Sequence, residues 1–116
     1  MLNTQRLRQD EVIKALKELR RTEKMKVVQV GLFGSYAKGM QTGDSDIDII
    51  LKADTPLFLI KDGYEEFIKE FIMKSLHKDC DVIDYADLQD DYERAKEDGF
   101  EDYCMKNIVD REVIML

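Results

Sequence analysis

The amino-acid sequence predicts an α/β (α+β) domain in which a small mixed β-sheet is flanked by helices. Segments with apolar residues at helical spacing alternate with short runs of β-branched residues. Their order is helix, strand, helix or loop, strand, helix, strand, helix, which is typical of a sheet packed against helices. The chain has 116 residues, of which 44% are hydrophobic and 37% charged, a size and composition that support one core. We therefore expect a single domain over residues 1–116.

The first half of the chain is expected to hold one helix and two strands. A helix is predicted over residues 4–21, and the valine-rich residues 27–33 indicate a buried strand. That strand ends at Gly34, and a glycine-bounded loop follows as far as Ser45. A second strand is predicted over residues 46–51, where aspartate alternates with isoleucine before a run of apolar residues.

A helix and a strand are expected next. Asp62 has the position of an N-cap, and Glu65, three residues later, completes a capping box. Apolar residues then recur at offsets of three and four, which predicts a buried helix face made of Tyr64, Phe67, Ile68, Phe71, Ile72 and Leu76. A third, short strand is predicted over residues 80–85.

The end of the chain is less regular. Asp87 is the expected cap of a helix that continues to Lys96, and Gly99 follows it. Residues 100–108 are a further helical candidate. Residues 113–116 form an apolar tail of unassigned state, and its packing on this domain or on a partner stays open.

Charge and composition exclude several classes of protein. The net charge is −7, and residues 79–102 carry eleven acidic and two basic side chains, whereas residues 1–26 carry eight basic and four acidic ones. Such an acidic chain is a poor ligand for nucleic-acid phosphates, so no direct nucleic-acid partner is expected. The asymmetry suits a basic protein partner, or simply two solvated helix faces of opposite sign. The apolar runs are too short for a membrane span, no signal peptide is evident, and two cysteines predict no disulfide framework, so a cytoplasmic location is expected.

The turn after the first strand can bind phosphate. Gly34 permits backbone angles that a side chain forbids, and Ser35 adds a hydroxyl donor. A helix starting here would direct unpaired backbone N–H groups at an anion, and Lys38 would add a positive charge. Most Gly-Ser turns only reverse the chain, so this turn alone does not decide between the two roles.

Two aspartates occupy alternate positions of the second predicted strand. Residues i and i+2 of a strand project from the same face, so Asp46 and Asp48 lie side by side. Like charges beside a core strand are unfavourable unless a cation compensates them, and magnesium prefers carboxylate and phosphate oxygens. An isolated pair of this kind also suits a solvated strand end beside the Gly43 turn.

A third carboxylate, Asp81, begins the third predicted strand. Pairing of that strand with residues 46–51 would bring Asp81 close to the other two aspartates. Three converging carboxylates fit two metal ions, with one carboxylate left to bridge a metal or accept a proton. Asp84 competes for this role, but it alternates to the opposite face and also suits a surface position near a helix cap.

The glycine-serine turn and the aspartates of the second predicted strand together resemble a motif of a known protein family. The string from Gly34 to Gly39, Gly-Ser-Tyr-Ala-Lys-Gly, and the later Ser45-Asp46-Ile47-Asp48 follow an apolar strand. This combination resembles the nucleotidyltransferase superfamily with the DNA polymerase β-like fold, and within it the minimal nucleotidyltransferase (MNT) branch. The resemblance extends from the leading helix through the Asp81 strand.

The resemblance implies a role for each matching residue. Gly34 and Ser35 would hold the β- and γ-phosphates of a nucleoside triphosphate, and Asp46 and Asp48 would bind two Mg²⁺ ions. Asp81 matches the third carboxylate, which completes the metal site or deprotonates the acceptor hydroxyl. The reaction would be in-line attack on the α-phosphate. The family commonly has arginine where Lys38 stands, and lysine lacks the bidentate fork of arginine.

The resemblance also implies a partner. MNT proteins of this length pair with HEPN RNase toxins in toxin–antitoxin modules, and some transfer AMP from ATP to a tyrosine of the toxin. We therefore expect an antitoxin that adenylylates a HEPN-type partner and forms an oligomer with it. Two alternatives stay open: a small-molecule nucleotidyltransferase of the aminoglycoside type, and a non-catalytic antitoxin that masks its partner.

Overall fold

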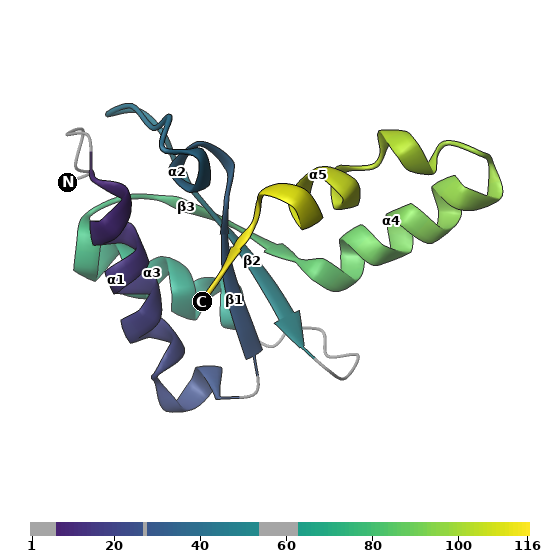
Figure 1. Ribbon diagram of the computed structural model, residues 1–116. Coiled ribbons are helices and arrows are strands. Elements are labelled where there is room, and N and C mark those ends of the chain that lie inside the picture. The colour runs from purple at the N-terminus through teal and green to yellow at the C-terminus, as the bar shows by residue number, and fades with distance from the viewer. Residues whose placement is uncertain (1–6, 27, 54–62) are drawn as a thin grey trace.

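Helices and strands alternate along the chain in the predicted order (Figure 1). The computed structural model describes residues 7–26, 28–53 and 63–116. The elements are α1 (Gln9–Arg20), the 3₁₀ turn η1 (Glu23–Met25), β1 (Val28–Phe33), α2 (Gly34–Lys38), β2 (Ile47–Ala53), α3 (Tyr64–Leu76), β3 (Cys80–Asp84), α4 (Tyr85–Glu97), the 3₁₀ turn η2 (Glu101–Tyr103), α5 (Met105–Glu112) and β4 (Ile114–Met115). Within these described ranges no helix is long and apolar enough to cross a membrane.

The four strands form one mixed sheet in the order β3-β2-β1-β4. Strand β1 runs antiparallel to both of its neighbours, β2 and β4, whereas β2 and β3 are parallel. In this register Asp48 lies opposite Phe33 on one side and opposite Asp81 on the other. The predicted α+β class, with a small mixed sheet flanked by helices, is therefore confirmed.

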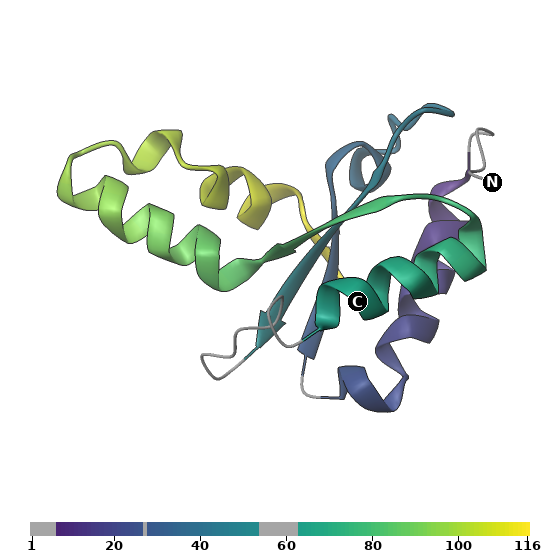
Figure 2. The same cartoon turned by 180° about the vertical axis from the view of Figure 1, so that it is seen from behind.

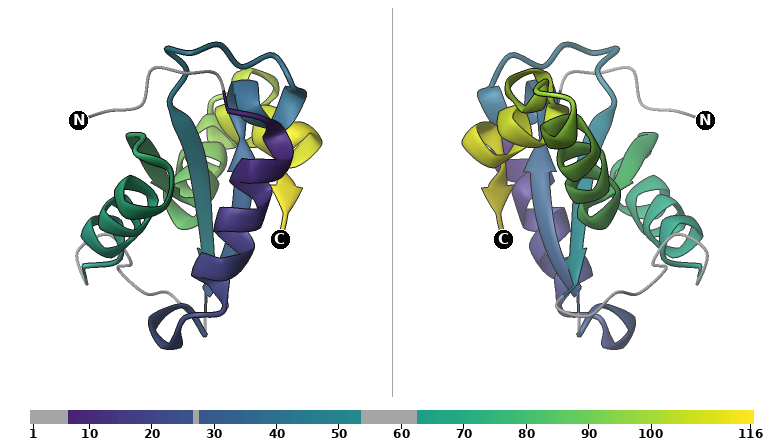
Figure 3. Two further views of the ribbon diagram at one scale, coloured as in Figure 1. Left: turned by 90° about the vertical axis from the view of Figure 1, so that its left-hand side faces the viewer. Right: turned by 90° about the vertical axis from the view of Figure 1, so that its right-hand side faces the viewer.

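The two faces of the sheet carry different helices. Helices α1 and α3 cover one face, and α4 and α5 lie on the other side, as the two end-on views show (Figure 3). Successive residues of β2 point to opposite faces. Ile47, Ile49 and Leu51 accordingly pack in the core under α1 and α3, whereas Ile50 packs with Leu88 and the α4–α5 side. Asp48 shares the α4–α5 face because it lies two residues before Ile50.

The main core lies between the sheet and the pair α1 and α3 (Figure 2). Most of its fully buried members follow the periodicity on which the elements were predicted: Val12, Leu16 and Leu19 from α1, Ile68 and Ile72 from α3, and Val30, Leu32, Ile47, Ile49 and Leu51 from the strands. Full burial of each such side chain contributes about 1.5–3 kcal/mol relative to exposure. This core holds β1 and β2 rigidly, and these strands in turn carry the aspartates.

Helix starts were the least accurate part of the prediction. Helix α1 begins at Gln9, not at Thr4, although residues 1–6 lie outside the described part of the chain. Asp62 also lies outside it, and the N-cap of α3 is Gly63, with a φ of 86°. The predicted cap Asp87 was wrong, because α4 begins directly where β3 ends. Asp84, a competitor for the site role for which a surface position near a helix cap was the other interpretation, is only 7% exposed.

Asp84 is the N-cap of α4, since its Oδ1 accepts a hydrogen bond from the backbone N–H of Ala86 at 3.0 Å. We expect Asp84→Ala to lower the free energy of unfolding by at least about 1 kcal/mol, the usual cost of a lost cap. Asp87→Ala serves as the matched control, because Asp87 is an exposed residue inside the helix. Urea denaturation of both variants would measure the difference, and equal losses would contradict the assignment of the cap.

The apolar tail packs on this domain. Ile114 and Met115 form β4, which pairs with Leu32 and Gly31 of β1. The backbone N–H of Leu116 donates to the carbonyl of Val30 at 2.9 Å. The helical candidate at residues 100–108 divides into the turn η2 and the first part of α5.

Candidate active site

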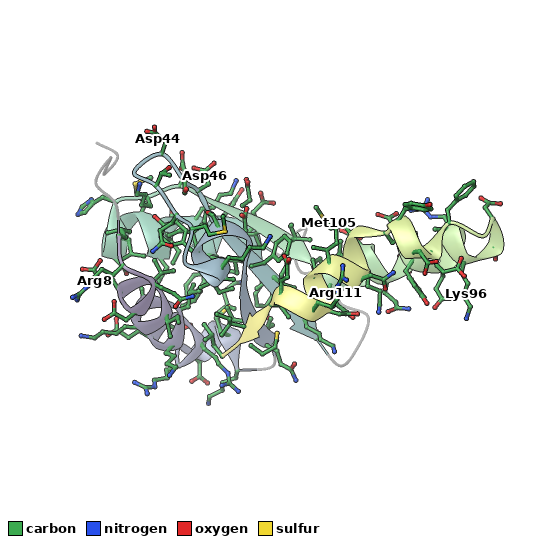
Figure 4. The ribbon with its side chains drawn as sticks, turned by 45° about the horizontal axis from the view of Figure 1, so that its top comes forward. Arg8, Asp44, Asp46, Lys96, Met105 and Arg111 are labelled. Atoms are coloured by element: carbon green, nitrogen blue, oxygen red, sulfur yellow. The ribbon has the colours of Figure 1, made fainter. Side chains whose placement is uncertain are left out.

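Three carboxylates gather at the end of the sheet where β2 and β3 begin. Asp48 is the second residue of β2, and Asp46 precedes the strand by one residue on the same face. Asp81 is the register partner of Asp48 across the parallel β2–β3 pair. Asp46 and Asp81 are exposed, whereas Asp48 is half-buried between them. Asp46 lies near Asp44 at the rim of the molecule (Figure 4). The structure thus places all three predicted carboxylates at one site.

The carboxylates influence one another electrostatically. Burial raises the pKa of Asp48 above its ordinary value of 3.8, and the negative charges of Asp81 and then Asp46 raise it further. The ionised form of Asp48 is therefore less favourable here than in water. A cation at this position would reverse that penalty.

The arrangement fits an open magnesium site. Within residues 7–26, 28–53 and 63–116, no three histidine, cysteine or acidic side chains enclose a metal ion by themselves. Magnesium usually binds through one or two carboxylates and completes its coordination with water and substrate phosphates. The donor set here, three carboxylates of which two are exposed, fits such a shared site and not a closed protein cage.

Gly34 allows the carboxylate of Asp48 to lie against the start of α2. A Cβ atom at Gly34 would lie 2.2 Å from Oδ2 of Asp48, and the φ of Gly34 is 75°. The backbone angle favours glycine, and a Cβ atom there would displace the Asp48 carboxylate. Helix α2 begins at Gly34 itself, with Ser35 as its second residue, so that the Gly-Ser pair lies directly beside Asp48.

Two glutamines that the sequence analysis did not single out hold α2 in place. The Gln9 Nε2 amide donates to the carbonyls of Tyr36 and Ala37 at 2.8 and 2.9 Å. The buried Gln41 Nε2 donates to the carbonyl of Leu7 at 3.0 Å. These bonds join the second half of α2 and the loop that follows it to the start of α1 and the residues just before α1. Isolated glutamines give no pattern in a single sequence, so no signal could have identified them.

Lys78 was also missed. It is 4% exposed, and its Nζ donates to the carbonyl of Gly43 in the loop that precedes β2. The backbone N–H of Ile47 donates to the carbonyl of Asp79 at 3.3 Å. Together these contacts fasten the loop carrying Asp46 to the chain that enters β3. A lysine next to an acidic segment reads as a surface residue, which explains the omission.

Lys38 is the remaining predicted site residue, and two further side chains near the site, Tyr36 and Cys80, are buried. Lys38 is exposed at the end of α2, and its Nζ forms an ion pair with Oε2 of Glu112 at 3.1 Å. Tyr36 is fully buried in the core, and burial and the charge of Asp46 raise its pKa. Cys80 is buried as well, and desolvation raises the pKa of its thiol to about 12. Neither side chain is therefore available as a nucleophile at neutral pH.

Three proteins from Methanocaldococcus jannaschii, each named "putative protein adenylyltransferase", are similar to this chain. One is 39% identical over 70 residues, which represent 60% of this chain and 69% of the relative. Another is 49% identical over 45 residues, 39% of this chain and 44% of that protein. The third is 39% identical over 51 residues, 43% of this chain and 52% of that protein. The last two matches span about half the length of each relative.

A solved structure described as a toxin-antitoxin with AMP-PNP shares 29% sequence identity and a TM-score of 0.44, over 67% of this chain and 57% of that one.

A family match covers almost the whole chain. The family described as "Nucleotidyltransferase domain" matches residues 10–115. These residues include the Gly34-Ser35 turn and all three carboxylates. The chain therefore belongs to the nucleotidyltransferase domain family.

Proposed function

We propose that this protein transfers AMP from ATP to a hydroxyl group of a partner protein. The observation that carries the proposal is the position of Asp48. Its carboxylate lies against Gly34 and opposite Asp81, with a raised pKa. A half-buried carboxylate placed beside two others serves no purpose in packing, but it suits a site that binds metal ions and a triphosphate.

Each site residue has a proposed role. Asp46 and Asp48 would hold two Mg²⁺ ions, and Asp81 would complete the site. When bound, the ions supply positive charge that neutralises the phosphate oxygens. Gly34 and Ser35 lie directly beside Asp48 and would bind the β- and γ-phosphates through the backbone and the Ser35 hydroxyl.

The proposed reaction is a single in-line displacement. The acceptor oxygen forms a bond to the α-phosphorus, while the bond from that phosphorus to the bridging oxygen of the β-phosphate breaks, and pyrophosphate leaves. The acceptor proton passes to a carboxylate. Asp81 suits this role because it is exposed and an incoming hydroxyl can reach it.

We infer that the acceptor is a tyrosine of a HEPN-type RNase toxin, which this protein silences as an antitoxin. The names of the relatives support a protein acceptor. The MNT-like string around Gly34 and Asp46 supports the toxin.

A transfer assay tests the proposal. The purified protein is incubated with Mg²⁺, lysate of its own source organism and each α-labelled nucleoside triphosphate in turn. We expect a labelled protein band with ATP, no band with the Asp46→Asn/Asp48→Asn variant, and an unchanged band with the exposed control Asp44→Asn. Mass spectrometry would identify the modified residue. If the variant silences its partner as well as the wild type does, the protein acts by masking instead.

Lys38 provides a separate prediction about the triphosphate. Its ion pair with Glu112 is half-exposed, so its loss should change the free energy of unfolding by less than about 1 kcal/mol. If Lys38 contacts the phosphates, Lys38→Gln should raise the KM for ATP roughly tenfold, the effect of losing about 1.4 kcal/mol of binding. Glu112→Gln removes the same ion pair but leaves the lysine, and its KM should not rise. Equal KM values for both variants would remove Lys38 from the site.

A further inference from the structure

Helices α4 and α5, with η2 between them, form a helical hairpin that extends away from the sheet (Figure 1). We call residues 85–112 the arm. At its base Leu88 and Val109 are buried against Ile50. From Gln89 to Ile108, however, no residue is buried. The outer part of the arm therefore has no core of its own, and its conformation depends on few apolar contacts.

The tip of the arm combines exposed apolar side chains with negative charge. Tyr103 is 86% exposed and Phe100 is 61% exposed, and Met105, the first residue of α5, is 51% exposed. Exposed carboxylates surround these side chains, among them Asp98 and Asp102. Neither of these two aspartates forms an ion pair within the described residues. Such a surface is complementary to cations arranged around an apolar floor.

A surface with that chemistry lies on the outer side of α1. One hollow of about 330 Å³ is lined by Lys17, Arg20, Arg21 and Leu116. A neighbouring hollow of about 390 Å³ adds Ile13 and Lys14, together with Asp10 and Glu18. We call the group Ile13, Lys14, Lys17, Arg20, Arg21 and Leu116 the α1 surface. Among the described residues, none of its four cations forms an ion pair.

We propose that the tip of the arm of one molecule docks on the α1 surface of a second copy. The arm and α1 lie at opposite ends of a molecule that is 44 Å long (Figures 1 and 2), so a molecule cannot occupy its own α1 surface. In the pair, Tyr103 lies on the apolar floor near Leu116, and Arg21 lies over its ring. Asp98 and Asp102 face Lys17 and Arg20.

The net charge of −7 does not prevent this contact. At physiological ionic strength, charges more than about 8 Å apart are largely screened. The opposite charges that meet at the interface therefore dominate over the repulsion between whole molecules. Because the two surfaces differ, the contact is head-to-tail, and repeated copies would form a chain or close into a ring.

Sedimentation velocity on the full chain tests the proposal over a range of protein concentrations, at physiological ionic strength and at 0.5 M salt. We expect the mass to rise with concentration above the monomer mass of 13.6 kDa and to fall again at high salt. Two variants, Lys17→Glu/Arg21→Glu on the α1 surface and Asp98→Lys/Asp102→Lys on the arm, should each remain monomeric. Tyr103→Ser should weaken association at least about tenfold, as expected for an aromatic side chain central to an interface.

The decisive measurement is a mixture of the two charge-reversal variants. Each variant retains the surface that the other has lost, and the two reversed surfaces are again opposite in charge, so an equal mixture should associate although neither variant associates alone. Glu66→Lys/Glu70→Lys and Lys74→Glu, on the exposed side of α3, are the matched charge controls and should associate like the wild type.

Two results would overturn the proposal. One is a wild-type chain that stays monomeric at every concentration, and the other is a mixture of variants that stays monomeric. If the monomeric chain instead binds a basic protein through the arm, the occupant is that protein and not a second copy. None of the substituted residues belongs to the carboxylate site, so nucleotide transfer can be measured independently in every variant.

Discussion

Asp48→Asn is expected to abolish nucleotidyl transfer and, at the same time, to make the protein more stable. Loss of a metal-binding carboxylate removes several kcal/mol of transition-state stabilisation, which corresponds to a decrease in kcat/KM of about 10³-fold or more. The stability should change in the opposite direction, because burial and two neighbouring charges raise the pKa of this carboxyl. Asparagine keeps the shape of the side chain and carries no charge, so the penalty disappears.

The pH dependence of the stability follows from the same rise in the pKa of Asp48. The folded-state pKa of Asp48 lies above 3.8, so the folded protein holds this proton more tightly than the unfolded chain does. The stabilisation is fully present at low pH and is lost as the pH rises through the raised pKa. In the metal-free wild type, thermal unfolding should show this loss, and Asp48→Asn should remove that part of the pH dependence. The control Asp44→Asn should change neither activity nor stability, and a destabilised Asp48→Asn protein would contradict the electrostatic explanation.

Gly34→Ala is expected to damage both the fold and the site. The new Cβ would lie 2.2 Å from Oδ2 of Asp48, on a backbone with a φ of 75°. The left-handed backbone costs about 1–2 kcal/mol for a residue with a side chain, and the overlap is relieved when the Asp48 carboxylate turns away from Gly34. We expect a loss of about 1–2 kcal/mol in the free energy of unfolding, together with displacement of the Asp48 carboxylate and loss of transfer.

Gly39 is a control that separates the cost of the left-handed backbone from the effect of contact with Asp48. It has a nearly identical φ of 72°, but a Cβ there would meet nothing within 4 Å. Gly39→Ala should therefore show the backbone cost alone and retain its activity. Chemical denaturation and the transfer assay would measure both variants. If Gly39→Ala loses as much activity as Gly34→Ala, backbone strain and not contact with Asp48 explains the effect.

The strands and the main core were predictable because their sequence patterns reflect burial directly. The side chains of β2 alternate between the two faces of the sheet. This alternation separates the apolar residues under α1 and α3 from the aspartates on the other face. The helix caps were harder, because several acidic residues near the start of α4 are equally suitable in sequence. Asp84 is the N-cap because β3 continues directly into α4 without an intervening loop. Strand β4 was unpredictable for another reason, since two residues carry no periodicity and pair with a strand more than 80 positions away.

The carboxylate cluster was predictable from two short segments, whereas its support was not. Asp46, Asp48 and Asp81 stand at positions that strand geometry alone brings together. Gln9, Gln41 and Lys78 hold α2 and the loop before β2 through side-chain hydrogen bonds to distant backbone carbonyls. Such contacts depend on the tertiary fold and leave no spacing in the sequence.

The arm has a consequence for how this protein can evolve. Since residues 89–108 include no buried side chain, most substitutions there should alter the free energy of unfolding by no more than about 0.5 kcal/mol. The sheet and the three carboxylates tolerate far less change. Natural variation can therefore accumulate on the arm while the chemistry is conserved, and a new binding preference can arise without a compensating change in the core. In a library of all single substitutions, tolerance should drop abruptly at Leu88 and again at Val109, the two residues that fasten the arm to the sheet.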